Sequence, residues 1–252
     1  MSFFVFLIGM CCGSFVNMLV YRTARRYGVE SQRPKVKSQR SVCDFCSKQL
    51  RWYENMPVLS WILQKGKSRC CQKKLPVLYP IVEVGMGVLF LLNFKFLIFN
   101  LEMFFGMVVI TMLVFATVFD LKYMVLPDFS TVVLIMVAVL GLVVVGFDWS
   151  YVISAIGASG FLWFLYLITK GKGMGFGDVK LAIFMGLWLG WPKILLAFYV
   201  AFISGAVVGG GLMVVKKLKR KSQIAFGPFL ILGTVVSWWW GEEIIKLSKW
   251  FF

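Results

Sequence analysis

The chain has 252 residues, carries a formal net charge of +16 and contains no histidine. Apolar residues make up 60% of it and aromatic residues 17%, whereas a soluble domain is roughly 45–50% apolar. The absence of histidine excludes Ser-His-Asp triads, Cys-His pairs and HExxH zinc sites. The composition excludes an ordinary soluble domain and predicts an all-α polytopic membrane protein.

Long apolar runs recur along the chain and predict about eight transmembrane helices. We expect the first run to be a retained anchor, because no basic segment precedes it and its positive cluster follows it. A break at Trp191-Pro192 separates the sixth helix from the seventh. The expected spans are 2–21, 77–94, 97–119, 129–147, 150–169, 179–191, 193–215 and 225–247.

The distribution of positive charge predicts the orientation of these helices. With both termini outside, the inner loops contain 23 of the 27 Lys and Arg residues, as the positive-inside rule requires. The charge is therefore expected to set topology and attract anionic membrane lipids, rather than bind nucleic acid. Three parts follow: the first transmembrane helix at 1–21, a basic cytoplasmic loop at 22–76, and a transmembrane bundle at 77–252.

Four acids lie at or inside the expected cytoplasmic ends of the spans: Glu83, Asp120, Asp128 and Asp178. An ionisable group at membrane depth indicates function by default. Asp120 ends the third span, where the helix dipole disfavours a negative charge and no structural role calls for one. If Asp120 met Asp178, the two could share a proton. One would then act as a general base while the other polarises a carbonyl.

Asp128 and Asp178 also have a purely structural interpretation. Each opens an apolar run, so each could be a helix N-cap. The short loop before Asp178 contains Gly175 and Gly177, which would let a peptide backbone approach closely. A flexible loop would explain one or two glycines, but it would not explain a pairing of Asp178 with Asp120.

The segments FDLKYMVLPD (119–128) and GFGD (175–178) resemble the paired motifs of membrane aspartyl proteases with a GxGD active site. Three more segments make the chain similar to bacterial type IV prepilin peptidase: GSFVNMLVYR (13–22), the cysteine-bearing loop at 43–71 and LYPIVE (78–83). The resemblance implies that Asp120 and Asp178 are the catalytic pair, with Asp128, Gly175 and Gly177 supporting them.

The resemblance also implies the reaction. Such enzymes remove the leader of type IV prepilins or pilin-like proteins on the cytoplasmic side of the bacterial inner membrane, after a glycine, in pilus assembly, secretion or competence. Members with the cysteine loop then methylate the new N-terminal amine with S-adenosylmethionine. Cleavage itself needs no cofactor. The implied protein is a multi-pass membrane enzyme whose active site faces the cytoplasm.

The cysteine loop predicts a structural zinc site with ligands Cys43, Cys46, Cys70 and Cys71. A cytosolic loop favours thiolate–metal ligation over disulfides, and four thiolates suit tetrahedral zinc. The chain departs from the family pattern here, because Ser68 occupies the third cysteine position and Cys70 is displaced by two. A metal-free loop with free thiols is the alternative.

A methyl-donor site is expected near Gly66, Lys67 and Glu83. Gly66 and Lys67 match family positions close to the methyltransferase function, and Glu83 would contact a ligand amine or a basic loop residue.

Two other functions stay open. One is a peptidase whose methyltransferase has decayed, as Ser68 suggests. The other is a carboxylate-dependent transporter, which the glycine-rich loop allows but the similarity of a whole cytoplasmic loop disfavours.

Overall fold

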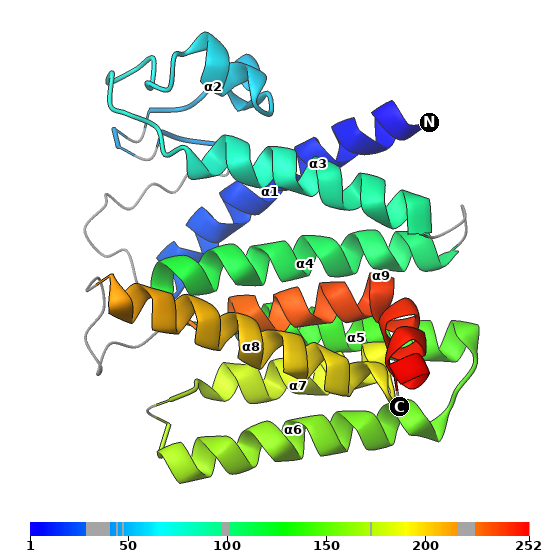
Figure 1. The fold of residues 1–252 in the computed structure, drawn as a ribbon. Helices are drawn as coiled ribbons and strands as arrows, with labels where there is room; N and C mark the ends of the chain where they lie inside the picture. Colours follow the sequence, from blue (N-terminus) through cyan, green and yellow to red (C-terminus); the bar gives the residue numbers. More distant parts are fainter. Residues whose placement is uncertain are drawn as a thin grey trace. The chain divides into compact units, whose positions relative to one another are not determined.

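The computed structural model describes residues 1–28, 41–43, 45–46, 48–96, 101–171, 173–215 and 225–251. In this part of the chain the regular elements are helices, with two isolated β-bridges, Val42–Gln49 and Lys67–Lys74. In order they are α1 (Ser2–Arg26), η1 (Trp52–Asn55), α2 (Leu59–Leu63), α3 (Leu78–Phe96), α4 (Leu101–Tyr123), α5 (Asp128–Val145), α6 (Trp149–Thr169), α7 (Phe176–Leu189), α8 (Lys193–Val214) and α9 (Gly227–Phe251) (Figure 1).

Each of the eight ranges expected to span the membrane coincides largely with one helix, from the 14 residues of α7 to the 25 of α1 and α9, so the predicted all-α class is confirmed. Five of these helices, α1, α3, α4, α6 and α8, are long and apolar enough to cross a membrane. The break between α7 and α8 falls at residues 190–192, as the Trp191-Pro192 pair predicts. The start of the third expected span and the basic stretch 216–224 lie outside the described residues.

The chain divides into two compact units, Met1–Phe115 and Ala116–Phe252, with the division inside α4. In the first unit, α1 packs against α3, and the two helices cross in the view of Figure 1. Gly9 and Gly13 allow this approach, because a Cβ at Gly13 would stand 2.7 Å from the Cα of Glu83. Small residues that let helix backbones touch are a common basis of packing between apolar helices. This close contact sets the position of Glu83 relative to α1.

The loop between α1 and α3 folds back on the two helices. The Ser14 hydroxyl donates to the carbonyl of Asn55 at 3.5 Å, and the backbone N–H of Val58 donates to Glu83 Oε2 at 2.7 Å. Ser14 is near the middle of α1 and Glu83 is in the second turn of α3. The η1–α2 segment therefore lies against the sides of α1 and α3, within the first unit.

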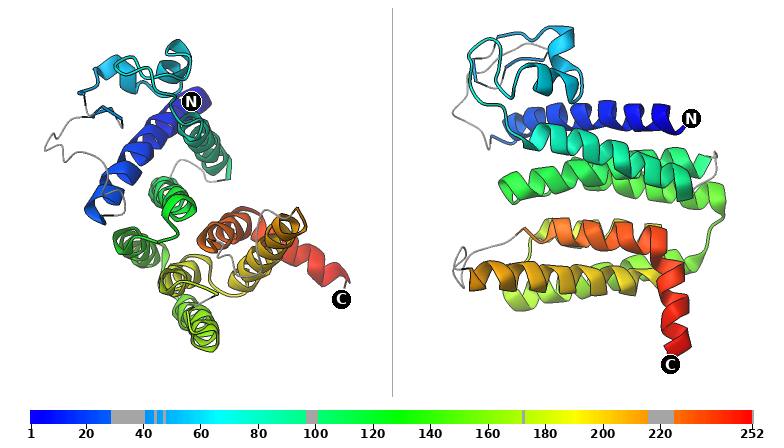
Figure 2. Two further views of the ribbon diagram at one scale, coloured as in Figure 1. Left: turned by 90° about the vertical axis from the view of Figure 1, so that its left-hand side faces the viewer. Right: turned by 45° about the horizontal axis from the view of Figure 1, so that its top comes forward.

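In the second unit α7 is the central helix, because it contacts α5, α6, α8 and α9. Its buried face includes Leu181, Ala182, Phe184 and Met185. Gly186 lets the helix approach the backbone of α6 at Ala155. The views in Figure 2 show α8 lying along the first part of α9, in agreement with their contacts. Asp178 is therefore held at the start of the most enclosed helix of the unit.

Candidate functional site

Asp120 lies in the last turn of α4 and its side chain is buried, with 5% of its surface exposed. Its carboxylate accepts a hydrogen bond from the backbone N–H of Gly227, the first residue of α9. The positive end of the α9 dipole is thus directed at the carboxylate, which offsets the unfavourable end of α4. A Cβ at Gly227 would stand only 2.5 Å from Asp120 Oδ2. The Asp120 carboxylate therefore packs directly against the first residue of α9, with no room for a side chain at position 227.

Asp178 is the third residue of α7 and is also buried, with 4% of its surface exposed. The N-cap position belongs to Gly175, so the interpretation of Asp178 as the N-cap is wrong. Its carboxylate instead reaches back and accepts the Gly175 N–H at 3.1 Å. An acid in the first turn of a helix is favoured by the helix dipole. The carboxylate is oriented by backbone, leaving one oxygen for other partners.

Asp120 and Asp178 are near enough in the second unit for the charge of Asp120 to act on Asp178. Each acid has one backbone N–H donor, from Gly227 and Gly175 respectively. Two buried carboxylates that repel one another favour a state in which they share one proton. The pair is thus chemically suited to act as one general base and one general acid.

Gly177 contributes to this site through packing. A Cβ at Gly177 would stand 2.8 Å from the Cβ of Leu126, in the connection between α4 and α5. Gly175 is less restricted, since a Cβ there would meet Asp178 Oδ2 at an ordinary 3.8 Å and its φ is −79°. Packing against Leu126 therefore requires glycine at position 177. No contact within the described chain requires glycine at position 175.

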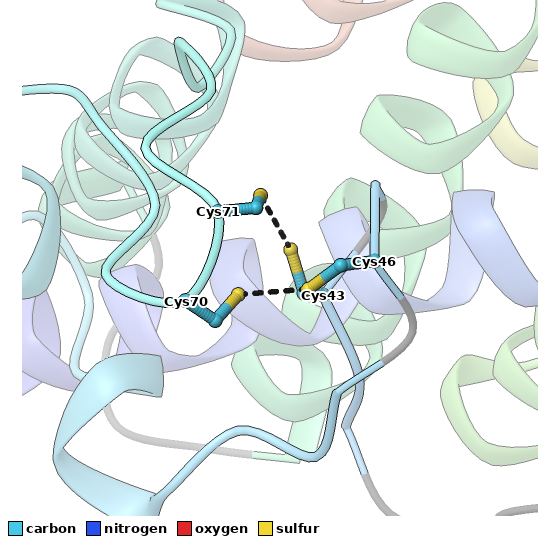
Figure 3. Close-up of side chains that lie close together, drawn as sticks. All are labelled: Cys43, Cys46, Cys70 and Cys71. Carbon is cyan, nitrogen blue, oxygen red and sulfur yellow. Dashed lines mark hydrogen bonds between the residues drawn. The ribbon is translucent and has the colours of Figure 1, made fainter.

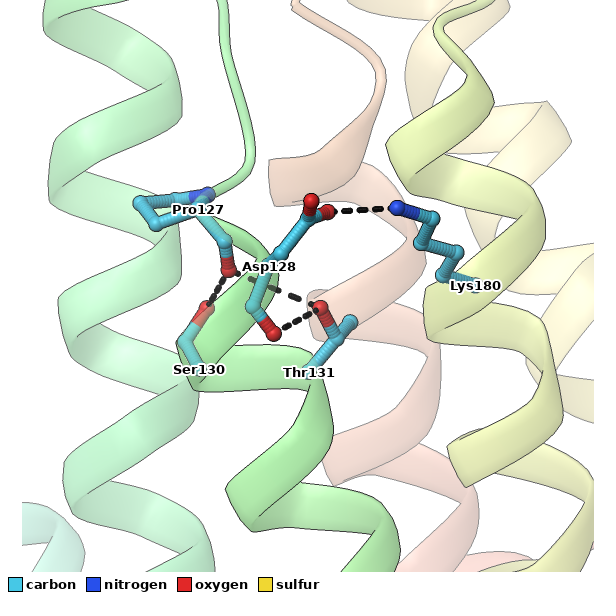
Figure 4. A network of polar contacts seen from close by, with 5 residues as sticks. All are labelled: Pro127, Asp128, Ser130, Thr131 and Lys180. Carbon is cyan, nitrogen blue, oxygen red and sulfur yellow. Dashed lines mark hydrogen bonds and ion pairs between the residues drawn. The ribbon is translucent and has the colours of Figure 1, made fainter. Parts of the chain in front are cut away.

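Asp128 does not cap α5, so that interpretation is wrong. Pro127 occupies the N-cap position, and Asp128 is the first helical residue. Its Oδ1 accepts from Lys180 Nζ at 2.6 Å, while Ser130 and Thr131 return hydrogen bonds to the backbone of the first turn (Figure 4). The ion pair is exposed and joins the start of α5 to α7, two residues beyond Asp178. Asp128 therefore has a linking role.

The four predicted zinc ligands come together in the first unit (Figure 3). The Sγ atoms of Cys43, Cys46, Cys70 and Cys71 all lie within 4.8 Å of one another. Cys46 Sγ is 3.0 Å from Cys70 Sγ, and Cys43 Sγ is 3.8 Å from Cys71 Sγ. Zn–S bonds of about 2.3 Å place tetrahedral sulfurs roughly 3.8 Å apart. The donor set and its spacing therefore fit a tetrahedral zinc ion.

Ser68, which replaces the expected third cysteine, is buried inside this cluster. Its hydroxyl is 3.3 Å from Cys43 Sγ and 3.0 Å from Cys70 Sγ. Burial opposes ionisation of Cys43, but hydrogen bonds from Ser68, from the Cys46 and Phe45 backbone and from Cys70 lower its pKa to about 6. Desolvation, together with Cys46 and Cys43, raises the pKa of Cys70 to about 12. Ser68 thus replaces a ligand with a hydrogen-bonding group.

Glu83 is buried in the first unit, with 7% of its surface exposed, beside a cavity of about 180 Å³. Its carboxylate accepts from the Val58 N–H, and the side chains of Ser14 and Asn17 lie within hydrogen-bonding range of it. Val58 has φ = +59°, which is a strained conformation for a β-branched residue. Strain of this kind tends to occur at functional sites. Here it presents the Val58 N–H to the carboxylate.

The two other expected methyl-donor residues do not line this cavity. The Lys67 side chain is exposed, and its backbone forms the bridge with Lys74. Gly66 has φ = +66°, and a Cβ there would stand 3.0 Å from the indole of Trp61, which does line the cavity. Of the three residues expected at the methyl-donor site, Glu83 lines the cavity. Gly66 lies next to a lining residue, Trp61, and Lys67 does not border the cavity.

Gly227 is the site residue that sequence reasoning missed. It precedes Pro228 after a basic stretch, a pattern typical of a helix start. That signal predicts where α9 begins, but it does not indicate that the first N–H of the helix meets Asp120. The pairing joins residues more than a hundred positions apart and becomes visible only in the folded chain.

Two parts of the chain match families of known proteins. Residues 7–97 match the bacterial peptidase A24 N-terminal domain, and residues 107–210 match the type IV leader peptidase family. The chain is 30% identical to the prepilin leader peptidase/N-methyltransferase of Aeromonas hydrophila, over 96% of this chain and 91% of that protein. It is 28% identical to the protein of the same name from Legionella pneumophila, over 95% and 91%.

A third relative of that name, from Pectobacterium carotovorum, is 31% identical over 91% of this chain and 89% of its own length. No solved structure matches the chain. The two family matches cover both units, and the relatives cover almost the whole sequence. The chain belongs to the type IV leader peptidase family.

Proposed function

We propose that this protein is a membrane aspartyl endopeptidase. It removes the leader of type IV prepilins or pilin-like proteins on the cytoplasmic side, after a glycine, and methylates the new N-terminal residue. The observation that carries the proposal is the pair of buried carboxylates, Asp120 and Asp178, each held by a backbone N–H. The relatives named prepilin leader peptidase/N-methyltransferase supply the substrate class.

In the proposed cleavage, the two acids hold one proton between them. The ionised carboxylate removes a proton from water, which attacks the scissile carbonyl carbon. The protonated carboxyl donates a hydrogen bond to the carbonyl oxygen and stabilises its developing charge. The proton then passes to the leaving amine as the C–N bond breaks. Backbone donors from Gly175 and Gly227 keep both acids in place throughout.

The proposed methyl transfer belongs to the first unit. Bound S-adenosylmethionine would supply an electrophilic methyl group to the unprotonated N-terminal amine. Glu83 and the Gly66–Trp61 contact would form part of that site, since both border the same cavity. Lys67 would act from the exposed surface, because its side chain is exposed and does not line the cavity.

The proposed zinc ion is structural. Cys43, Cys46, Cys70 and Cys71 would form a closed four-sulfur site that orders the loop between α1 and α3. The apolar content of this loop is low, so metal binding would supply much of its folding free energy. Cys70 then serves as the ligand that the family pattern places at Ser68.

The proposed topology has eight membrane crossings with both termini outside. The five helices long and apolar enough to span a membrane support it, as does the concentration of positive charge in the inner loops. Cysteine labelling should report residues 22–76 and 216–224 from the cytoplasm. Labelling of 216–224 from outside would mean that 179–215 crosses once, and would contradict the eight-span arrangement.

One experiment tests both proposed activities. Purified protein is incubated with a prepilin peptide and S-adenosylmethionine, and the products are identified by mass. Cleavage after glycine together with a 14 Da gain on the released mature peptide, the mass roughly of one CH₂, supports both. Cleavage without the gain supports a peptidase alone. No cleavage by protein that is folded and inserted contradicts the peptidase.

A further inference from the structure

The cavity beside Glu83 is built from three segments of the first unit. Its lining includes Asn17 of α1, Trp61 of α2 and Tyr79 of α3, together with Ser68 of the cysteine cluster. Its volume of about 180 Å³ is below the roughly 300–1,000 Å³ of pockets that enclose a whole small-molecule ligand. The cavity therefore suits one end of a larger ligand.

Glu83 is the acidic group buried at this cavity. Its partners among the described residues are the Val58 N–H and the side chains of Ser14 and Asn17, all of them neutral. The ion pairs that the structure shows in the described ranges are formed by Asp128 and Glu242, not by Glu83. A buried carboxylate without a cation is costly, and a positively charged ligand would offset that cost.

The rest of the lining narrows the chemistry of such a ligand. Arg22 and Arg25 also border the cavity, so the ligand should carry a carbonyl or anionic group besides its ammonium. Ser14 and Asn17 offer oxygen acceptors beside the carboxylate, and an ammonium group has three donors to satisfy them. The Trp61 indole N–H is buried and has no partner among the described residues. It would suit an acceptor on the same ligand, such as a backbone carbonyl or a carboxylate. An α-ammonium next to a carbonyl carbon presents both features.

We infer that this cavity binds the α-ammonium group of a methylation substrate, with Glu83 as the anion that recognises it. The inference rests on the proposed function, and two substrates carry such a group. One is the new N-terminus of the cleaved pilin, and the other is the methionyl end of S-adenosylmethionine. In both cases Glu83 binds the ammonium, and Ser14 and Asn17 hold the carboxylate in position.

The test measures the affinity of four probes for the full-length protein in detergent. Isothermal titration calorimetry or tryptophan fluorescence detects the binding. Four probes are used: a peptide starting with Phe, the same peptide N-acetylated, S-adenosylmethionine, and its 2-oxo analogue, which lacks the amine. We expect one amine-bearing probe to bind wild type at least about tenfold more tightly than its amine-free counterpart, since a buried charge pair is lost. Which pair shows the difference identifies the substrate.

The variant Glu83→Gln should remove that preference while binding the amine-free probe as wild type does. Glu54→Gln is the matched control, because Glu54 borders the same cavity but is only half-buried, whereas Glu83 is buried. The inference is overturned if wild type does not distinguish the amine-bearing probes from the amine-free ones. It is equally overturned if both variants lose affinity alike.

The comparison of free and blocked amines on wild type remains decisive if Glu83→Gln fails to fold. Cleavage of a prepilin peptide by the same wild-type preparation is measured alongside. Cleavage depends on Asp120 and Asp178, whereas recognition of the amine depends on Glu83. Failure of the proposed peptidase and failure of the ammonium site therefore give different results.

Discussion

Each unit of the chain buries carboxylates on apolar helices, and the two units surround them differently. In Met1–Phe115, Glu83 has neutral partners and a cavity at its side. In Ala116–Phe252, Asp178 has a second acid, Asp120, as its neighbour. A lone buried carboxylate is stabilised by a cation, whereas two adjacent carboxylates are stabilised by a shared proton. The same functional group is thus suited to ligand binding in one unit and to proton transfer in the other.

The two units also hold their functional groups by different means. Asp120 and Asp178 are oriented by backbone N–H groups at helix starts, which need no further cofactor. The loop beside Glu83 is short of regular structure and contains four clustered thiols. Its order would depend on a metal. Perturbing one unit should therefore leave the chemistry of the other largely intact.

The largest effect is expected from Asp120→Asn and Asp178→Asn. Each should lower cleavage of a prepilin peptide by at least about 10³-fold, because a pair that shares a proton fails when either member cannot ionise. Product masses measure the loss. Methylation of a peptide that already has a mature N-terminus is the control and should persist. Full cleavage activity in Asp120→Asn would exclude the acid pair.

The next largest effect is expected from Cys43→Ser or Cys46→Ser. Wild type should contain about one zinc per chain, and either variant should lose it, since a closed site needs all four ligands. Methyl transfer should fall more than about tenfold, while cleavage falls less. Metal analysis and the two product masses measure this. Cys11→Ser, at an exposed position of α1, is the control.

The single variants Cys70→Ser and Cys71→Ser sharpen the assignment of the ligands. Both should release zinc if Cys70 replaces the cysteine missing at position 68. If only Cys71→Ser releases it, the site has three thiolates and Ser68 or water completes it. Wild-type protein that was kept reduced, was never exposed to chelator and holds no zinc would rule out the metal site.

Gly227→Ala should lower cleavage by roughly 10- to 100-fold with little change in substrate affinity. Its Cβ would stand 2.5 Å from Asp120 Oδ2, so either the carboxylate or the start of α9 must shift. A displacement of about 1 Å at a catalytic group costs this much. Kinetic constants measure it. Gly210→Ala in α8 is the control, because nothing lies within 4 Å of its added Cβ. Equal activity of the two variants would contradict the role of Gly227.

The smallest effect is expected from Asp128→Asn, with about a two- to threefold loss of cleavage. The variant removes an ion pair with Lys180 that is exposed to solvent, and such pairs contribute less than about 1 kcal/mol. Lys180→Met should cause a similar loss, and the double variant should lose little more than either single. Additive losses in the double variant would show that the two residues act separately.

Local patterns in the sequence predicted much of this protein. Apolar runs predicted a helix in each of eight ranges, and the Trp191-Pro192 pair predicted the break between α7 and α8. The Cys-x-x-Cys and Cys-Cys pairs predicted a four-sulfur cluster, which the structure shows. These features succeed because helix length and ligand type depend on nearby residues. Capping of α5 by Asp128 was wrong because the N-cap is Pro127, one residue earlier, which the apolar pattern does not fix. The Asp128 side chain instead pairs with Lys180, 52 positions away.

The remaining features were decided by contacts between distant segments. The approach of Asp178 to Asp120, the donation by Gly227 and the enclosure of Glu83 each join different helices. Composition and periodicity predict that a helix forms, but they do not specify its rotation or its neighbours. Those depend on close packing, as where Gly13 admits the backbone of α3 and Gly177 admits Leu126. The sequence alone therefore indicated which residue types form the site. Their partners were decided by tertiary packing, because close packing brings together segments that are distant in the chain.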